Sequence, residues 1–248
     1  MSQTDQKLRF CLLQARNPGD PVREEEHQAF ADRLGVEADC IRGVDVLNEP
    51  LNEGLLEGVD ALVIGGAGEY SVVEPPEPIQ KLIDFVGLVG DQGFPTFASC
   101  FGFQCLVVAL GGEVIHDSDG SEVGSTWVDL SPEGAQDSLF GNLPGRFIAQ
   151  QGHKDRASVL PSEAICLAKN AAVPFQAIRL GEKPVFATQF HPELTGATNR
   201  LRFERYIAHY GEVFGAQRAR QMLKEFVPSP EASSLLAGFS DFLRSKRV

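Results

Sequence analysis

The stretch TFASCFGFQ, residues 96–104, places a cysteine between an apolar strand pattern and a helical pattern. We predict a strand over residues 95–99 and a helix over residues 102–110, with Cys100 in the tight turn between them. A residue in such a turn adopts a strained backbone conformation that exposes its side chain, and small residues must stand two positions before and after it. The positive end of the following helix favours the thiolate. Taken alone, the stretch also fits a buried core cysteine.

The segments around this stretch alternate between strand and helix patterns. Before it, we predict strands at residues 8–13, 39–46 and 61–64 and helices at residues 22–34 and 78–89. This rhythm is typical of a parallel sheet covered on both faces. After it, strand patterns follow in quick succession at residues 114–115, 126–130, 147–150, 165–168, 175–179 and 185–190. We therefore predict an α/β protein with an open, mostly parallel sheet whose second half is partly antiparallel.

The chain becomes helical after Pro192. One helix is predicted over residues 198–210, and two further helical stretches follow, separated by the segment 228–230, Pro-Ser-Pro. We predict one domain over residues 1–211 and a helical C-terminal extension over residues 212–248.

The composition is that of a soluble globular protein, with 43% apolar and 23% charged residues. The net charge of −12 and the lack of a Lys/Arg-rich block argue against nucleic acids and anionic membranes as partners. No apolar run reaches the roughly 20 residues of a membrane-spanning helix, and residues 1–7 carry no signal-peptide pattern. The cysteines are odd in number and fit no zinc pattern, so we predict a cytoplasmic protein without a metal site.

A second chemical feature is QFHPE, residues 189–193, at the end of a predicted strand. In an extended chain, residues i and i+2 point the same way. Glu193 is therefore expected to accept a hydrogen bond from one imidazole nitrogen of His191 and to orient the ring. The other nitrogen is then free to take the proton of Cys100. On its own, a His-Pro-Glu triplet is more often part of a loop.

A third feature is the glycine turn IGGAG, residues 64–68, directly after a strand. Glycines at such a place let the backbone approach a ligand closely. The amide of Gly66, paired with that of Phe101, is expected to form an oxyanion hole for the substrate carbonyl. A plain turn between strand and helix is the alternative, whereas the glycine spacing does not fit a dinucleotide fingerprint.

Taken together, Cys-x-Gly-x-Gln after a strand and the later Gln-Phe-His-Pro-Glu resemble the class I glutamine amidotransferases. Further segments fit in the same order: residues 138–140 (SLF), 151–155 (QGHKD), 160–161 (LP) and 175–178 (FQAI). The resemblance runs from about residue 8 to residue 210. It extends to stand-alone members related to the glutaminase part of GMP synthase.

This resemblance implies a flavodoxin-like α/β domain with a Cys-His-Glu triad and no cofactor. Cys100 would be the nucleophile that forms a γ-glutamyl thioester. His191 would act as general base and then as acid to the leaving amine, and Glu193 would orient His191.

The resemblance also implies the residues around the triad. Gly66 and Phe101 would supply the oxyanion amides. Gln104 matches a position that helps to hold the backbone groups of glutamine, and His153 and Asp155 lie in a segment that borders the same pocket.

Three positions depart from the family pattern without removing a triad member. Ala98 stands where glycine is usual, Phe103 where histidine is often found, and Ala67 where proline is common. We expect Ala98 to alter the turn slightly and Phe103 to make its position apolar and change substrate choice.

The sequence leaves the physiological reaction open. The chain carries no synthase domain and no P-loop, so a glutaminase would deliver ammonia to a separate synthase subunit. Stand-alone hydrolysis of γ-glutamyl peptides or amines fits the same residues. A non-catalytic regulatory protein that keeps the fold is the third alternative, which the intact triad disfavours.

Overall fold

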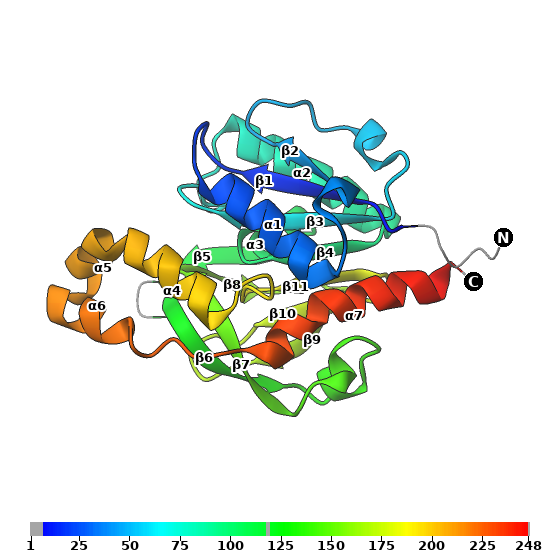
Figure 1. Ribbon diagram of the computed structural model, residues 1–248. Helices are drawn as coiled ribbons and strands as arrows, with labels where there is room; N and C mark the ends of the chain where they lie inside the picture. Colours follow the sequence, from blue (N-terminus) through cyan, green and yellow to red (C-terminus); the bar gives the residue numbers. More distant parts are fainter. Residues whose placement is uncertain (1–6, 118–119, 248) are drawn as a thin grey trace.

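The structure of the protein is a computed structural model that describes residues 7–117 and 120–247 (Figure 1). The segment 1–6, where no signal peptide is predicted, and residue 248 lie outside the described residues. Within the two described ranges, none of the helices combines the length and the apolar character that a bilayer crossing requires.

Strand β1 (Phe10–Ala15) decides how the layers form, because it is buried along its whole length. Cys11 and Leu13 belong to one hydrophobic core, and Phe10 and Leu12 to another. Alternate residues of a strand point to opposite faces of the sheet. A strand that is apolar on both faces therefore lies inside a sheet that is covered on both sides.

The described residues form one large sheet and one small one. The large sheet has nine strands within residues 7–117 and 120–247, in the spatial order β2 (Ile41–Asp45), β1, β3 (Ala61–Ala67), β4 (Thr96–Ser99), β11 (Val185–Thr188), β10 (Ala177–Leu180), β9 (Ala164–Lys169), β6 (Glu122–Leu130) and β7 (Arg146–His153). Pairs from β2 to β11 are parallel, and pairs from β11 to β7 are antiparallel. The predicted change from parallel to antiparallel pairing is thus confirmed. The small sheet pairs β5 (Glu113–His116) with β8 (Asp155–Val159), a strand that the sequence patterns did not indicate.

Helices cover both faces of the large sheet, which gives the flavodoxin-like arrangement expected from the sequence. On one face α1 (Val22–Leu34) packs beside α7 (Pro230–Lys246), and the Ser240 hydroxyl donates to the carbonyl of Leu34 at 2.8 Å. On the other face lie α2 (Glu77–Gln92) and α3 (Phe101–Ala109). Short 3-10 helices occur at Ala38–Cys40, Glu53–Leu56, Gly134–Gln136 and Phe140–Asn142.

Helix α7 lies within the second core rather than at its margin. The ring of Phe239 makes edge-on contacts with Phe97 at 5.6 Å and with Phe186 at 6.1 Å between centroids. Residue 211, the predicted limit of the first domain, lies inside α5 (Ile207–Phe214). The division into residues 1–211 and 212–248 stays a prediction.

The prediction of one helix over residues 198–210 is wrong, because the chain bends at Tyr206. The structure has α4 (Gly196–Arg205) before the bend, and α5 and α6 (Ala216–Met222) after it. The bend folds Tyr210 back onto Phe203, and the two rings stack with centroids 4.2 Å apart. These helices form a third, small core, and Figure 1 shows α5 and α6 projecting from one end of the molecule.

Candidate active site

Cys100 occupies the predicted turn between β4 and α3. Its backbone angles are φ 52° and ψ −103°, and among the described residues it alone has a positive φ without being glycine. Such a conformation costs about 1–3 kcal/mol and persists only where the surroundings enforce it. Here the Cys100 amide donates to the carbonyl of Thr188 at 2.7 Å, and the Cys100 carbonyl accepts from the amide of Gln104 at 3.1 Å.

The residues beside the cysteine explain how this turn is packed. A Cβ atom at Gly102 would lie 2.7 Å from the carbonyl oxygen and 2.8 Å from the Cβ of Ile64, so only glycine fits. Ala98 is accommodated in the core between the strands. Phe103 is fully buried in the same core. The position is therefore apolar as expected, and the effect of Phe103 on substrate choice stays a prediction.

His191 and Glu193 meet as expected, but through a different backbone geometry. His191 Nδ1 and Glu193 Oε1 are 2.6 Å apart. The predicted strand to residue 190 is wrong, because β11 ends at Thr188. The Leu194 amide instead donates to the His191 carbonyl at 3.2 Å, which closes a tight turn with Pro192 at its second position. The turn, not an extended chain, brings the carboxylate to the imidazole.

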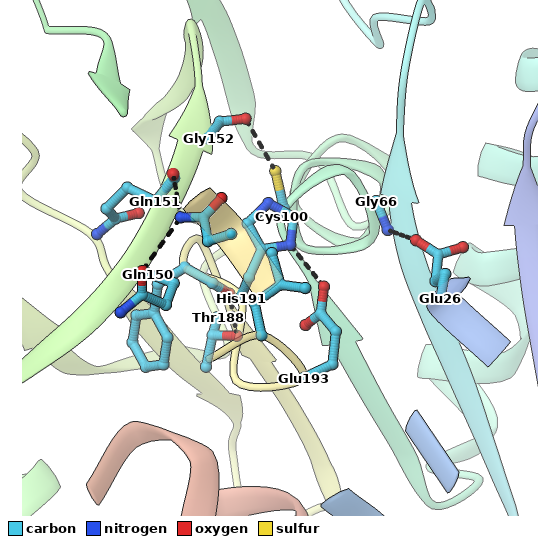
Figure 2. Close-up of polar contacts among 12 residues, drawn as sticks. Glu26, Gly66, Cys100, Gln150, Gln151, Gly152, Thr188, His191 and Glu193 are labelled. Carbon is cyan, nitrogen blue, oxygen red and sulfur yellow. Dashed lines mark hydrogen bonds and ion pairs between the residues drawn. The ribbon is translucent and has the colours of Figure 1, made fainter. Parts of the chain in front are cut away.

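The imidazole of His191 lies between Cys100 and Glu193 (Figure 2). Because Nδ1 faces Glu193, Nε2 is the nitrogen left for the sulfur. Burial alone would lower the pKa of His191, but the charges and hydrogen bonds of Cys100 and Glu193 outweigh burial and raise it to about 10. Burial alone would raise the pKa of Glu193, but the charge and hydrogen bond of His191, together with the charge of Arg202, lower it. The site therefore favours a protonated imidazole beside an ionised Glu193 carboxylate.

The Cys100 sulfur is almost enclosed by backbone and amide groups. It lies 4.0 Å from the carbonyl oxygen of Gly152 and 4.0 Å from Nε2 of Gln189. A Cβ atom at Gly152 would be 3.6 Å from Nε2 of His191, so this stretch of β7 passes close to the side chains of both Cys100 and His191. Figure 2 shows Gly152 and His191 on either side of Cys100.

The two expected oxyanion amides differ in this structure. Phe101 is the first residue of α3, and amides in the first turn of a helix have no partner within the helix. The Gly66 amide instead donates to Oε1 of Glu26 at 3.1 Å. The expected pair of amides facing the substrate is therefore not formed here, and the oxyanion role of Gly66 and Phe101 stays a prediction.

Gln104 ties the cysteine helix to its surroundings. Its Nε2 donates to the Asp155 carbonyl at 2.8 Å and, more weakly, to Oε1 of Gln189 at 3.4 Å. These contacts place Gln104 close to the sulfur's neighbours, while its binding of substrate stays a prediction.

The side chains of His153 and Asp155 differ in how the protein surrounds them. His153 Nε2 lies 3.3 Å from Oε2 of Glu122 in a buried setting, but neither ring nitrogen of His153 makes a hydrogen bond with any residue that the structure describes. The carboxylate of Asp155 accepts from the Ser71 hydroxyl at 2.6 Å and lies 2.9 Å from Nδ1 of His116. Asp155 thus links neighbouring segments of the protein, and the contact of both residues with substrate stays a prediction.

The other cysteines lie in different surroundings. All five cysteines are free thiols. Burial raises the pKa of Cys11 to about 11 and raises the pKa of Cys105 and of Cys166 as well. Cys100 alone adjoins a histidine and a helix start. Within residues 7–117 and 120–247, no three His, Cys, Asp or Glu side chains are grouped to hold a metal ion.

Two residues of the site were missed by the sequence reasoning. Gln189 belongs to the QFHPE stretch, but nothing in its spacing singled it out. Glu26 lies in the acidic segment of α1, which is typical of a solvated helix surface, yet its side chain is fully buried against the glycine turn. Only tertiary structure brings it there.

Comparisons with known proteins relate the chain to one family. The family model described as Glutamine amidotransferase class-I matches residues 32–207. One relative, from Thermoplasma volcanium, is a subunit of GMP synthase (glutamine-hydrolyzing); it is 28% identical over 176 residues, covering 71% of this chain and 80% of that one. The GMP synthase (glutamine-hydrolyzing) of Aliivibrio salmonicida is 31% identical over 143 residues. That match covers 58% of this chain but only 26% of the longer protein.

Solved structures with the same fold include two glutamine amidotransferases. The one from Thermotoga maritima has a TM-score of 0.67 and 18% identity, with 97% of each chain covered. The one from Methylobacillus flagellatus has a TM-score of 0.67 and 17% identity, with 97% of this chain and 94% of the other covered. At these identities the likeness establishes the fold alone.

Proposed function

This chain belongs to the class I glutamine amidotransferase family, and from that premise we propose that it hydrolyses the γ-amide of glutamine through a thioester on Cys100. One observation carries the proposal. Cys100 is held in a strained turn beside His191, whose Nδ1 is fixed by Glu193 at 2.6 Å. A nucleophile, a base and a group that orients the base are the parts that covalent acyl transfer needs.

The chemistry follows from these positions. The sulfur of Cys100 attacks the amide carbon of glutamine, and the carbonyl oxygen becomes an oxyanion. His191 carries the proton that the thiol has lost and gives it to the leaving nitrogen, so that ammonia departs and a γ-glutamyl thioester remains. His191 then takes a proton from water, which attacks the thioester and releases glutamate. Glu193 keeps the ring in one orientation throughout.

The acceptor of the ammonia is a separate synthase subunit in this proposal. The Thermoplasma relative is named as one subunit of GMP synthase, and the match spans 80% of its length. The free cysteines fit a reducing compartment, and we place the protein in the cytoplasm on that basis. Hydrolysis of γ-glutamyl peptides or amines without a partner is the competing function of the same triad.

The test compares the purified wild-type protein with two variants, in each of which one cysteine is replaced by alanine. Glutamine and a panel of γ-glutamyl peptides are supplied, and released glutamate is measured. Cys100→Ala removes the nucleophile, while Cys166→Ala removes a cysteine in β9 that does not contact the site. We expect glutamate from the wild type and from Cys166→Ala but none from Cys100→Ala.

The substrate preference separates the two functions. Glutamine as the best substrate supports the glutaminase, and preference for peptides supports the stand-alone hydrolase. Release of glutamate by Cys100→Ala at the wild-type rate would refute the triad. A wild-type protein silent towards every substrate, with and without added synthase, would favour a regulatory protein that has lost catalysis.

A further inference from the structure

Glu26 is a buried carboxylate next to the triad that the mechanism above does not use. Its side chain is 0% exposed. Oε1 accepts from the Gly66 amide at 3.1 Å and from Nη2 of Arg16 at 3.0 Å, and Oε2 accepts from Nε2 of Gln14 at 3.0 Å. A buried charge is retained only with such partners, because desolvation is costly. The carboxylate is thus firmly placed.

Glu26 packs directly against the glycine turn. A Cβ atom at Gly65 would lie 2.7 Å from Cδ of Glu26, so the carboxylate fills the space that any other side chain would need. A Cβ atom at Gly66 would lie 3.1 Å from Cε1 of His191 and 3.8 Å from Oε1 of Glu26. The turn therefore packs against both Glu26 and the catalytic imidazole.

The direction of the Gly66 amide follows from this arrangement. Its N–H bond points to Glu26, on the side of the turn away from Cys100 (Figure 2). A hydrogen bond to a carboxylate is roughly twice as strong as one between neutral groups. The amide that the oxyanion would need is therefore held by a strong, competing acceptor.

The opposite orientation of the amide requires the rotation of one peptide group. Rotation of the peptide between Gly65 and Gly66 would turn the N–H bond towards the sulfur. Glycine at both positions keeps the steric cost of such a rotation low. What opposes it is the hydrogen bond to Glu26.

We propose that Glu26 is a positioning residue that holds the Gly66 amide away from the oxyanion site, with Arg16 and Gln14 holding Glu26. Glutamine hydrolysis is then slow until the Gly65–Gly66 peptide turns towards Cys100. The inference rests on the proposed function, because it concerns the same reaction.

The first test is Glu26→Gln, which keeps the size of the side chain but makes the acceptor neutral. Loss of one oxyanion donor lowers kcat about 10²–10³-fold in other enzymes. We therefore expect Glu26→Gln to raise kcat for glutamine about 10- to 100-fold, with little change in KM. The matched control is Glu25→Gln on the same helix, which breaks an exposed ion pair with Arg205 and leaves kcat unchanged.

A second variant avoids leaving the charge of Arg16 buried without its partner Glu26. Glu26→Leu combined with Arg16→Met removes both charges and the acceptor together. It is expected to hydrolyse glutamine at least as fast as Glu26→Gln. The ¹⁵N–¹H signal of Gly66 gives a readout independent of turnover. We expect it at low field in the wild type, as for an amide bonded to a carboxylate, and shifted upfield in both variants.

The outcomes separate this inference from the proposed function. Faster turnover in folded Glu26 variants with a shifted Gly66 signal supports the inference. Equal or slower turnover in those variants, with an active wild type, overturns it and leaves the glutaminase intact. No turnover in any variant overturns it as well. Labelling of Cys100 by a diazoketone analogue of glutamine then shows whether the glutamine site itself exists.

Discussion

Gly102→Ala tests whether the turn at Cys100 depends on the close packing described above. The added methyl would lie 2.7 Å from the Ile64 carbonyl oxygen, 2.8 Å from its Cβ and 2.9 Å from its Cγ2. Two of these atoms cannot move without moving β3. Overpacking of this kind costs about 1–3 kcal/mol, and the higher helix propensity of alanine offsets at most about 1 kcal/mol. We expect a net loss of about 2 kcal/mol, which lowers Tm by roughly 4–8 °C in a chain of this size.

The same substitution should impair catalysis more than stability. Relief of the contact shifts the start of α3, and a displacement of about 1 Å at a reacting group can cost about 10²-fold in rate. Glutamate release and thermal unfolding are measured for Gly102→Ala and for Gly238→Ala. In the control, the nearest atom is Cδ1 of Leu139 at 2.9 Å, the end of a side chain that rotates away. If Gly102→Ala keeps wild-type kcat and Tm, the steric account of the turn is refuted.

Four further predictions follow from the site and the core. Glu193→Gln weakens a charge-assisted hydrogen bond of 2.6 Å, which is worth about 1.5–3 kcal/mol. The kcat for glutamine should therefore fall roughly 10- to 150-fold. An NMR titration of the variant should place the pKa of His191 below that of the wild type. Because the pKa of Glu193 is lowered from 4.5 in the folded state, its stabilising contribution is present above pH 4.5 and is lost as the pH falls through the folded-state pKa. Urea unfolding at a series of acidic pH values should therefore show that the difference in unfolding free energy between the wild type and Glu193→Gln disappears. At neutral pH, iodoacetamide should modify Cys100 before Cys11, whose pKa burial raises to about 11, and peptide mass spectrometry that finds the reverse order would contradict the assignment. Phe239→Ala should cost about 3–5 kcal/mol because the ring is fully buried, and calorimetry showing an unchanged Tm would mean that α7 is not part of the core.

Local patterns were sufficient for much of the fold. The helix predicted over residues 22–34 has those bounds in the structure, and the glycine that follows it, Gly35, is a local signal for its end. The strand, turn and helix around Cys100 were likewise predicted from residues that are adjacent in the sequence. The bend at Tyr206 was not predictable in this way, because it depends on the stacking of Tyr210 on Phe203.

In the candidate site, too, some features were predictable from local sequence and others depend on tertiary contacts. The types and order of Cys100, His191 and Glu193 indicate the chemistry from the sequence alone. The turn that joins the last two depends on where β11 ends, which the apolar run to residue 190 concealed. The contact between Glu26 and Gly66 joins residues 40 positions apart. No periodicity or motif records such a contact, so only the three-dimensional structure reveals it.

The position of α7 in the second core bears on the order in which the protein is made. The ribosome synthesises α1 and every strand of the large sheet before it reaches Pro230, the first residue of α7. Until then the surface around Phe97 and Phe186 lacks the rings that cover it. A nascent chain with such an uncovered apolar face is prone to aggregate. Because α7 emerges so late, we expect chaperones to bind this intermediate and to release it once α7 has packed onto the sheet.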